Sequence, residues 1–454
     1  MKKLLLSFLA IVSFTSFSQE DSPTSYSSLF HLAGSKYEPA ILGDDYKNIH
    51  IGIINTYFWA GNTTLNVDQI LKIADGSFDR SDANRVFDGD RNIHRFGLGA
   101  NIDVMHVGIR FNKPDESEMF SVSLGASLRT ETNVLMSDNF FKLAYNGNGS
   151  AQFRGKKVDM PLAFNSFSAL EYALGFAMPI PIQIDDLEFK GGVRLKYLSG
   201  IYSAYTKDAQ FSIETEAMGE FIDLGYQYEF HTTFDTTFST DDEFSNGLAN
   251  AGSGFGADIG VTAHYKERFY GNINLLDIGS IKWKSDGTVY KNEGVIRYEG
   301  VEVDNIFSDD IVLNDTIFDE IIEDAESVEQ EEEFKMPYPL RMRLHLSYKV
   351  PGETSKGVRY DKHTIGFTYI QGFRDLGNAT KRPYLAAGYL FNLNNILEAG
   401  TNLGILGYNR IESGLFLGVR GGPVRIGIGS GNILSLIRKV GTGADFNFNL
   451  TLAF

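Results

Sequence analysis

Hydrophobic and polar residues alternate over long stretches of this chain. From Leu187 to Tyr197, apolar residues and one glycine occupy the odd positions, whereas glutamate, lysine, arginine and another glycine occupy the even ones. A period of two places apolar side chains on one face of a β-strand and polar side chains on the other. The same alternation recurs in Phe120–Arg129, Ala257–Tyr265, Arg341–Val350, Ile365–Tyr369 and Phe446–Phe454. The chain is therefore predicted to consist mainly of β-strands.

Turn signals separate these segments. Lys266-Glu267 lies between two alternating stretches and predicts a hairpin, and Asp286-Gly287, between Trp283 and Tyr290, predicts a second one with a two-residue turn. Counting alternating segments gives roughly 14–16 strands, and we take about 14 as the expected number. We expect short helices at Val67–Ala74, at Asp138–Ala144 and in part of 304–333. No linker rich in proline or serine interrupts residues 49–454, so they are predicted to form one domain.

Alternation fits both a soluble sandwich and a membrane barrel. Most of the alternating segments run to about 9–11 residues, the length at which a tilted strand crosses a bilayer. Tyrosine and phenylalanine crowd near their ends, as in the aromatic girdles of membrane barrels. Proline is scarce, with 11 in the chain, and the last strand ends on Phe454. These features favour an all-β, antiparallel transmembrane barrel with a few short helices in loops or lumen, and a soluble exported β-protein is the alternative.

The alternation also predicts which side chains line the lumen. A lysine or arginine on the lipid face of a barrel costs about 2–4 kcal/mol at mid-bilayer. The cationic face of each strand should therefore point inward and its apolar face toward lipid. The predicted lumen-lining residues are Lys190, Arg194, Lys196, Arg341, Arg343, His345 and Lys349.

The N-terminus predicts export. Lys2 and Lys3 precede a short apolar stretch, and Ser16 and Ser18 provide small residues at a cleavage site, which together form a secretory signal peptide over residues 1–18. Residues 19–48 then form an N-terminal segment that we expect inside the barrel. No later run approaches the ~18 apolar residues of a membrane-spanning helix.

Composition excludes several functions. The chain has 454 residues and no cysteine, so disulfides and thiolate metal sites are ruled out. Its net charge of −17 argues against a nucleic-acid partner. The eight histidines show no zinc-ligand spacing, and no serine stands in a recognisable catalytic context. We therefore expect no enzyme activity, no cofactor and no metal.

An acidic stretch is the least ordinary segment of the sequence. Residues 298–334 carry many aspartates and glutamates and no lysine or arginine. One hypothesis is that this segment folds into the cationic lumen as a plug. The competing interpretation is a solvated acidic loop, and calcium binding is a third. The plug candidates are Asp309, Asp310, Asp319, Glu320, Glu323 and Asp324.

Three stretches resemble a known family. They are 254–260 followed by 275–283, then 191–200, and Met336-Pro337-Tyr338-Pro339-Leu340 at the entry to a strand. These residues resemble a Bacteroidota family of outer-membrane barrels of unassigned function, which is distantly similar to long-chain fatty-acid transporter barrels and to barrels associated with type IX secretion. Such proteins usually carry Asn-Pro-Ala near the mature N-terminus, where this chain has Glu38-Pro39-Ala40. The resemblance implies a location and a fold but no binding residues.

The expected function follows from the fold and the resemblance together. The chain is predicted to be a transport channel in the cell outer membrane for small hydrophobic or amphiphilic solutes. The alternative is a non-conducting barrel that serves as a subunit or accessory of a secretion or surface-attachment complex. The expected partners are outer-membrane lipid, the barrel assembly machinery and, for the alternative, other envelope proteins.

Overall fold

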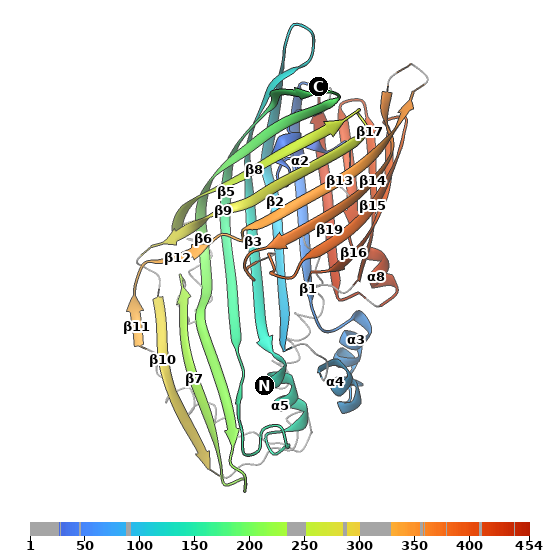
Figure 1. Cartoon of the computed structure of the whole chain (residues 1–454). Helices are drawn as coiled ribbons and strands as arrows, with labels where there is room; N and C mark the ends of the chain where they lie inside the picture. Colours follow the sequence, from blue (N-terminus) through green and yellow to red (C-terminus); the bar gives the residue numbers. More distant parts are fainter. Residues whose placement is uncertain are drawn as a thin grey trace.

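Fourteen antiparallel strands form a closed ring in the computed structural model (Figure 1). The structure describes residues 27, 29–44, 47–87, 92–233, 251–284, 288–299, 328–354, 357, 359–377, 379–407, 411–439 and 441–454. Each ring strand pairs with the next, and the last pairs with the first, from His50 opposite Ala453 to Gly61 opposite Gly443. The predicted all-β barrel of about 14 strands is confirmed.

The ring strands are β1 (Ile49–Asn62), β2 (Ile93–Asn112), β3 (Glu118–Ser137), β5 (Leu162–Ile184), β6 (Leu187–Thr215), β8 (Gly252–Tyr265), β9 (Phe269–Trp283), β13 (Arg341–Glu353), β14 (Arg359–Gly372), β15 (Tyr384–Leu393), β16 (Leu397–Leu406), β17 (Ile411–Gly421), β18 (Val424–Ser430) and β19 (Gly443–Ala453). The described helices are α2 (His31–Gly34), the 3₁₀ helix η2 (Pro39–Ile41), α3 (Val67–Asp75), α4 (Arg80–Phe87), α5 (Asp138–Asn146) and α8 (Ile433–Ile437). None of the helices in the described ranges is long and apolar enough to cross a membrane.

The two ends of the barrel differ. At one end, which we call the short-turn end, the turns are 113–117, 185–186, 266–268, 394–396 and 422–423, β13 ends where β14 begins, and the start of β1 meets the C-terminus. At the other, the long-loop end, the connections are mostly long and carry α3, α4, α5 and α8 (Figure 1). The hairpin predicted at Lys266-Glu267 is confirmed, and both residues adopt a φ of 53°.

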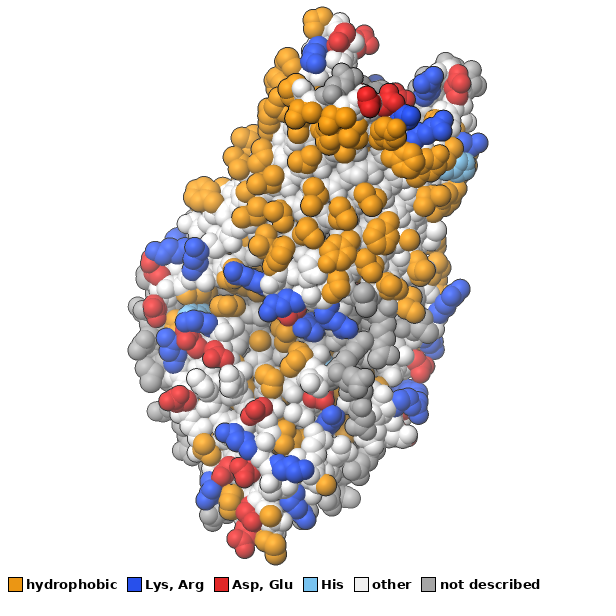
Figure 2. All heavy atoms as spheres, in the orientation of Figure 1, with side chains coloured by type: hydrophobic (Ala, Val, Ile, Leu, Met, Phe, Trp, Pro, Cys, Tyr) orange, Lys and Arg blue, Asp and Glu red, His pale blue; other side chains and the backbone are white. Residues whose placement is uncertain are grey.

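Apolar side chains cover the outside of the barrel near the short-turn end. Leu124, Leu174 and Leu195 point outward and are more than half exposed. Figure 2 shows hydrophobic side chains gathered over the upper half of the molecule, whereas most of the charged side chains lie in the lower half and at the extreme upper tip. An exposed apolar surface of this extent is typical of a surface that contacts lipid.

A side sheet extends the barrel at the long-loop end. β5 and β6 run for 23 and 29 residues, far beyond the about 9–11 needed to cross a bilayer. The distal half of β6 pairs with β4 (Lys157–Asp159) and β7 (Phe221–Thr232), β7 pairs with β10 (Thr288–Glu299), and β10 pairs with β11 (Val328–Glu331). We call this unit the side sheet. A further short strand, β12 (Phe334–Pro337), continues the wall beside β9.

Some local predictions succeed and others fail. The helices expected at Val67–Ala74 and Asp138–Ala144 are confirmed as α3 and α5. The hairpin predicted across Asp286-Gly287 is wrong, because Trp283 pairs with β8 and β12 while Tyr290 pairs with β7 and β11. The expected helix in 304–333 falls mostly outside the described residues, and its described end is strand β11. The signal peptide over 1–18 also lies outside them.

Candidate functional site

A segment near the N-terminus lies inside the barrel. We call residues 29–44 the insert; it contains α2 and η2 and contacts strands all around the ring (Figure 1). Its Phe30 is buried edge-on against Phe416 of β17, with ring centroids 6.1 Å apart. A Cβ atom at Gly427 of β18 would lie 2.7 Å from the Phe30 ring, so this glycine makes room for it. The insert thus fills a socket that the wall strands provide.

Ion pairs fix the tip of the insert. Lys36 pairs with Asp103 of β2 and donates a hydrogen bond to Asn101 at 2.9 Å. Glu38 pairs with Arg343 of β13. The hydroxyl of Tyr270 on β9 donates a second hydrogen bond to Glu38, at 2.8 Å. Both charges on the tip therefore meet an opposite charge on the wall, which buried charges require.

Both ends of the insert lie toward the short-turn end. Near its start, the Arg425 guanidinium at the beginning of β18 donates a hydrogen bond to the Leu29 carbonyl at 2.9 Å. Near its end, the Lys190 ammonium donates to the Leu42 carbonyl at 2.6 Å and to the Asp44 carboxylate at 2.7 Å. The chain therefore enters the lumen, turns at Lys36–Glu38 and returns to the same mouth.

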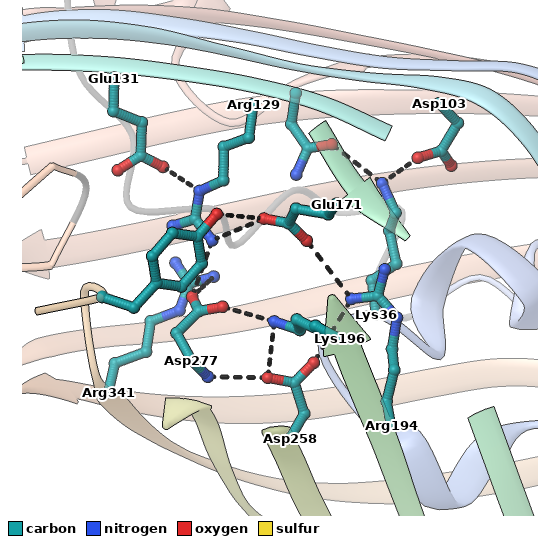
Figure 3. A network of polar contacts seen from close by, with 12 residues as sticks. Lys36, Asp103, Arg129, Glu131, Glu171, Arg194, Lys196, Asp258, Asp277 and Arg341 are labelled. Carbon is teal, nitrogen blue, oxygen red and sulfur yellow. Dashed lines mark hydrogen bonds and ion pairs between the residues drawn. The ribbon is translucent and has the colours of Figure 1, made fainter. Parts of the chain in front are cut away.

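A second layer of charges lies deeper in the lumen (Figure 3). We call it the lumen network, and it contains four cations and four carboxylates: Arg129, Glu131, Glu171, Arg194, Lys196, Asp258, Asp277 and Arg341. Because the two signs are equal in number, the network carries no net formal charge. It balances itself without help from the insert.

Several contacts of the lumen network join strands that are not neighbours in the ring. Arg129 on β3 donates to Asp277 on β9 at 2.9 Å, although three strands separate β3 from β9 in the ring. Lys196 on β6 contacts Asp258 at 2.7 Å and Asp277 at 2.5 Å. Tyr338 donates to Glu171 at 2.7 Å, and its ring centre lies 5.0 Å from the Arg129 guanidinium carbon. These side chains therefore occupy part of the lumen between β3 and β9.

A bulge in β9 places Asp277 in the network. Leu276 and Asp277 are both buried, which breaks the alternation of the strand, and the pairing with β8 shifts at the same point. Asp277 adopts a φ of 63°, a left-handed conformation that aspartate tolerates better than most residues. Its backbone N–H donates to Asp258 at 2.7 Å. The bulge therefore turns a carboxylate inward at a position where simple alternation gives no such signal.

The long-loop mouth is covered by a loop between β14 and β15. In this loop, Asp375 accepts two hydrogen bonds of 3.2 Å from the Arg95 guanidinium. Burial raises the pKa of Asp375, but the charge and hydrogen bonds of Arg95 outweigh burial and leave the pKa below its usual value. Gly377 has a φ of 54° and packs against Glu131 of the lumen network. The loop thus contacts the lumen network on the side that faces the long-loop end.

The short-turn mouth opens into a vestibule of about 860 Å³. Its lining includes His31 and Asp44 of the insert and Glu118, Lys190 and Lys349 of the wall. Glu118 accepts a hydrogen bond from Lys190 at 2.7 Å, so this lysine joins the wall to the end of the insert. A solute that enters from this side first meets the insert.

The structure places the predicted lumen-lining residues in three groups. Arg194, Lys196 and Arg341 belong to the lumen network, and Lys190 and Arg343 hold the insert. His345 is buried and contacts the Thr368 hydroxyl at 3.0 Å, whereas Lys349 lies half-buried at the vestibule and pairs with Asp361 at 2.8 Å. The plug candidates, Asp309, Asp310, Asp319, Glu320, Glu323 and Asp324, lie outside the described residues.

Sequence reasoning missed the carboxylates and Arg129. Arg129 and Glu131 share the inward parity of β3, and Glu171 and Asp258 are acidic residues on otherwise apolar or small-residue strands. Such isolated charges on inward positions were a usable signal. Among the described residues, no group of three His, Cys, Asp or Glu side chains is arranged to hold a metal ion.

Known structures of similar shape are outer-membrane barrels with very different sequences. The toluene transporter TbuX of Ralstonia pickettii is 9% identical over 93% of this chain and 94% of its own, with a TM-score of 0.40. The CymD monoaromatic hydrocarbon channel is 10% identical over 95% and 97%, with a TM-score of 0.43. The translocator domain of the autotransporter NalP from Neisseria meningitidis is 9% identical over 94% and 93%, with a TM-score of 0.32.

The fold is assigned from the strand pairing of this chain itself, because structural similarity at such low sequence identities does not support conclusions about function. No curated protein matches the sequence. A family model matches residues 39–431, which include most of the barrel and the end of the insert. The chain therefore belongs to the family of unknown function DUF5723.

Proposed function

We propose that this protein is an outer-membrane channel for small hydrophobic or amphiphilic solutes and that the insert closes it at rest. The observation that carries the proposal is the insert itself. A segment that enters and leaves through the same mouth, and is held by side-chain contacts, can leave the lumen without breaking the barrel. A barrel with a purely structural role has no need of such a removable segment.

The surface beneath the insert supports the choice of solute. Phe30 and Leu29 pack against Leu390 and Phe416 of the wall, so displacement of the insert uncovers an apolar surface. The cations that hold the insert, Arg343 among them, lie within the same lumen. An apolar surface flanked by cationic groups suits a molecule with a hydrophobic body and a polar or anionic end.

The location is part of the proposal. Bacterial outer-membrane barrels have short turns on the periplasmic side and longer loops outside. The short-turn end, the vestibule and the insert would then face the periplasm, and the side sheet would face the exterior. Export through a signal peptide over 1–18, insertion by the barrel assembly machinery and contact with outer-membrane lipid are part of the same proposal.

A reversible lock on the insert tests the channel. Asp44 and Glu118 both contact the Lys190 ammonium at 2.7 Å and border the open vestibule. The sequence has no cysteine, so Asp44→Cys with Glu118→Cys gives a unique pair for a short bismaleimide that contains a cleavable disulfide. Uptake of a small aromatic hydrocarbon and of a medium-chain carboxylic acid is measured in proteoliposomes.

The locked protein should take up neither probe faster than protein-free liposomes, and reduction of the linker should restore uptake. Each single-cysteine variant treated with the same reagent is the control. Equal uptake in the locked and unlocked states would refute the role of the insert. No uptake of either probe by the unlocked protein would refute the channel.

That last outcome would favour the second candidate function. The lumen network balances its own charges and joins β3, β6, β8, β9 and β13, and in this second candidate function it keeps the barrel closed even without the insert. A permanently closed barrel with a large side sheet suits a subunit or accessory of a secretion complex, such as the type IX system, or of a surface-attachment complex. Other envelope proteins would then be its partners.

A further inference from the structure

The side sheet has a polar outer face that the lumen does not explain. Phe211, Ile222 and Leu224 of its other face pack with Phe153 and Met160, on the side of α5. On the outer face, the strand registers place polar side chains in rows across the sheet. One row joins Gln210 of β6, Gln227 of β7 and Glu293 of β10, and the next joins Asp159 of β4, Ser212, Gly225 and Val295.

Glycine makes this face concave. Gly225 lies in the middle of the second row, and a Cβ atom there would come within 2.5 Å of the Ser212 hydroxyl. The missing side chain leaves a hollow of about 410 Å³ whose lining also includes Lys157, Gly294 and Tyr226. That volume falls in the range of small-molecule sites, about 300–1,000 Å³.

The polar groups of the hollow are not used by the fold. In the described part of the chain, the amides of Gln210 and Gln227 and the carboxylates of Asp159 and Glu293 make no hydrogen bond or ion pair with protein. Each amide offers two donors and an acceptor, and each carboxylate offers acceptors only. Donors and acceptors from four strands therefore converge on one small hollow.

This set of groups selects a chemical class. Two carboxylates against one lysine give the hollow a formal charge of −1, which disfavours anionic ligands such as phosphates and uronic acids. A pure hydrocarbon would leave the amides and carboxylates of the hollow without hydrogen-bond partners, which disfavours it. A neutral polyhydroxyl compound both donates and accepts hydrogen bonds, so it can satisfy the amides and the carboxylates of the hollow together.

We infer that the hollow binds one or two units of a neutral saccharide. The site lies on the side sheet, outside the lumen, so it is separate from the proposed channel. With the long-loop end directed outward, the hollow faces the cell exterior, where it meets polysaccharide rather than periplasmic solutes. The channel can fail its own test without affecting this inference, and the reverse also holds.

Saturation-transfer NMR tests the site on the full-length protein in lipid nanodiscs. Nanodiscs are preferred because sugar-headed detergents would compete for the hollow. The probes are maltotriose, cellotriose, mannotriose and galactotriose at up to about 10 mM, a concentration that detects the weak affinity expected of so few hydrogen bonds. A trisaccharide of galacturonic acid serves as the anionic comparison.

At least one neutral trisaccharide should show saturation transfer. Gly225→Leu fills the hollow and should abolish the signal, whereas Gln227→Ala should raise Kd about 5- to 10-fold, the effect of losing one or two net hydrogen bonds. The Gln210→Ala/Gln227→Ala double variant covers the case in which Gly225→Leu does not fold. Asp208→Ala is the matched control, because Asp208 lies on the same face beyond the hollow, and it should leave Kd unchanged.

Three results would overturn the inference. The first is the absence of transfer to all four neutral trisaccharides. The second is a signal that persists in a folded Gly225→Leu variant or in the double-glutamine variant. The third is binding of the galacturonic acid trisaccharide as tightly as the best neutral one, because the charge of the hollow opposes it.

Discussion

Asp277 contacts three cations at once. Lys196, Arg129 and Arg341 approach its carboxylate at 2.5, 2.9 and 3.4 Å, and all four side chains are almost fully buried. A buried charge without a partner is far more costly than a buried pair. At the residue scale, the stability of the barrel therefore depends on each buried charge having a partner of opposite charge. Replacing one of these charged residues by a neutral one should strongly lower the free energy of unfolding.

Replacing Asp277→Asn tests this dependence. The change removes the negative charge that Lys196, Arg129 and Arg341 share, so we expect the free energy of unfolding to fall by about 3–5 kcal/mol. Unfolding of the barrel by urea in detergent measures this free energy. Asp208→Asn, on the exposed outer face of the side sheet, should change it by less than about 0.5 kcal/mol. If Asp277→Asn and the wild-type protein unfolded with the same urea midpoint, the result would contradict this dependence.

His231 in the side sheet provides a pH prediction. Burial lowers the pKa of His231, and it outweighs the Glu229 carboxylate that accepts a hydrogen bond from the ring at 2.8 Å. The folded state therefore favours the neutral imidazole. The unfolded chain binds more protons below about pH 6.5, so the stability that this group contributes is present above that pH and falls as the pH is lowered.

NMR titration of the His231 ring should give a midpoint below the ordinary 6.5 of histidine. Spectra of a His231→Gln variant assign the resonance. A midpoint at or above 6.5 would show that the carboxylate dominates over burial.

The insert is the element on which the proposed channel function depends. It is short, its two helices span four and three residues, and it has no sheet pairing, so side-chain contacts must hold it. Phe30 is the largest apolar side chain of the insert and is almost fully buried. Elements held by a few side chains are the ones that open at the lowest free-energy cost.

Phe30→Ala should loosen the insert without unfolding the barrel. Loss of a buried phenylalanine costs about 3–5 kcal/mol, so amide hydrogen exchange of residues 29–44 should accelerate about 100-fold or more. Exchange in β1 and β19, which close the ring, should not change. Phe446→Ala is the matched control, since Phe446 lies on the outer face and is 42% exposed. Equal exchange of the insert in both variants would contradict its proposed anchoring.

The ring strands could be predicted from the sequence because a single pattern, the alternation of apolar and polar residues, determines them. Alternation identifies the ring strands and places Lys190, Arg194 and Lys196 inward, because a one-residue shift would expose them to lipid. Strand partners are not encoded in alternation, so the hairpin at Asp286-Gly287 was predicted where none exists. The bulge at Asp277 breaks the alternation on which the prediction depends. The N-terminal segment was expected inside the barrel, but no periodic pattern in it could predict the contacts that the insert makes.

The whole molecule is asymmetric along the barrel axis. The apolar belt surrounds the short-turn half, whereas charged side chains and the side sheet occupy the long-loop half (Figure 2). The insert and then the lumen network, which is covered by the Arg95–Asp375 loop, lie in series along the lumen. A solute would meet them in that order from the short-turn end. The account therefore depends on this barrel spanning the outer membrane with the long loops outside.

Cysteine labelling in intact cells tests this orientation most directly. Met218 lies in the β6–β7 turn at the long-loop end and is 82% exposed, and Asp115 lies in the exposed β2–β3 turn at the short-turn end. Because the natural sequence has no cysteine, Met218→Cys and Asp115→Cys each create a single target. A membrane-impermeant maleimide should label Met218→Cys in intact cells and Asp115→Cys only after the outer membrane is permeabilised. Labelling of Asp115→Cys in intact cells, or protection of both sites from the reagent after permeabilisation, would contradict it.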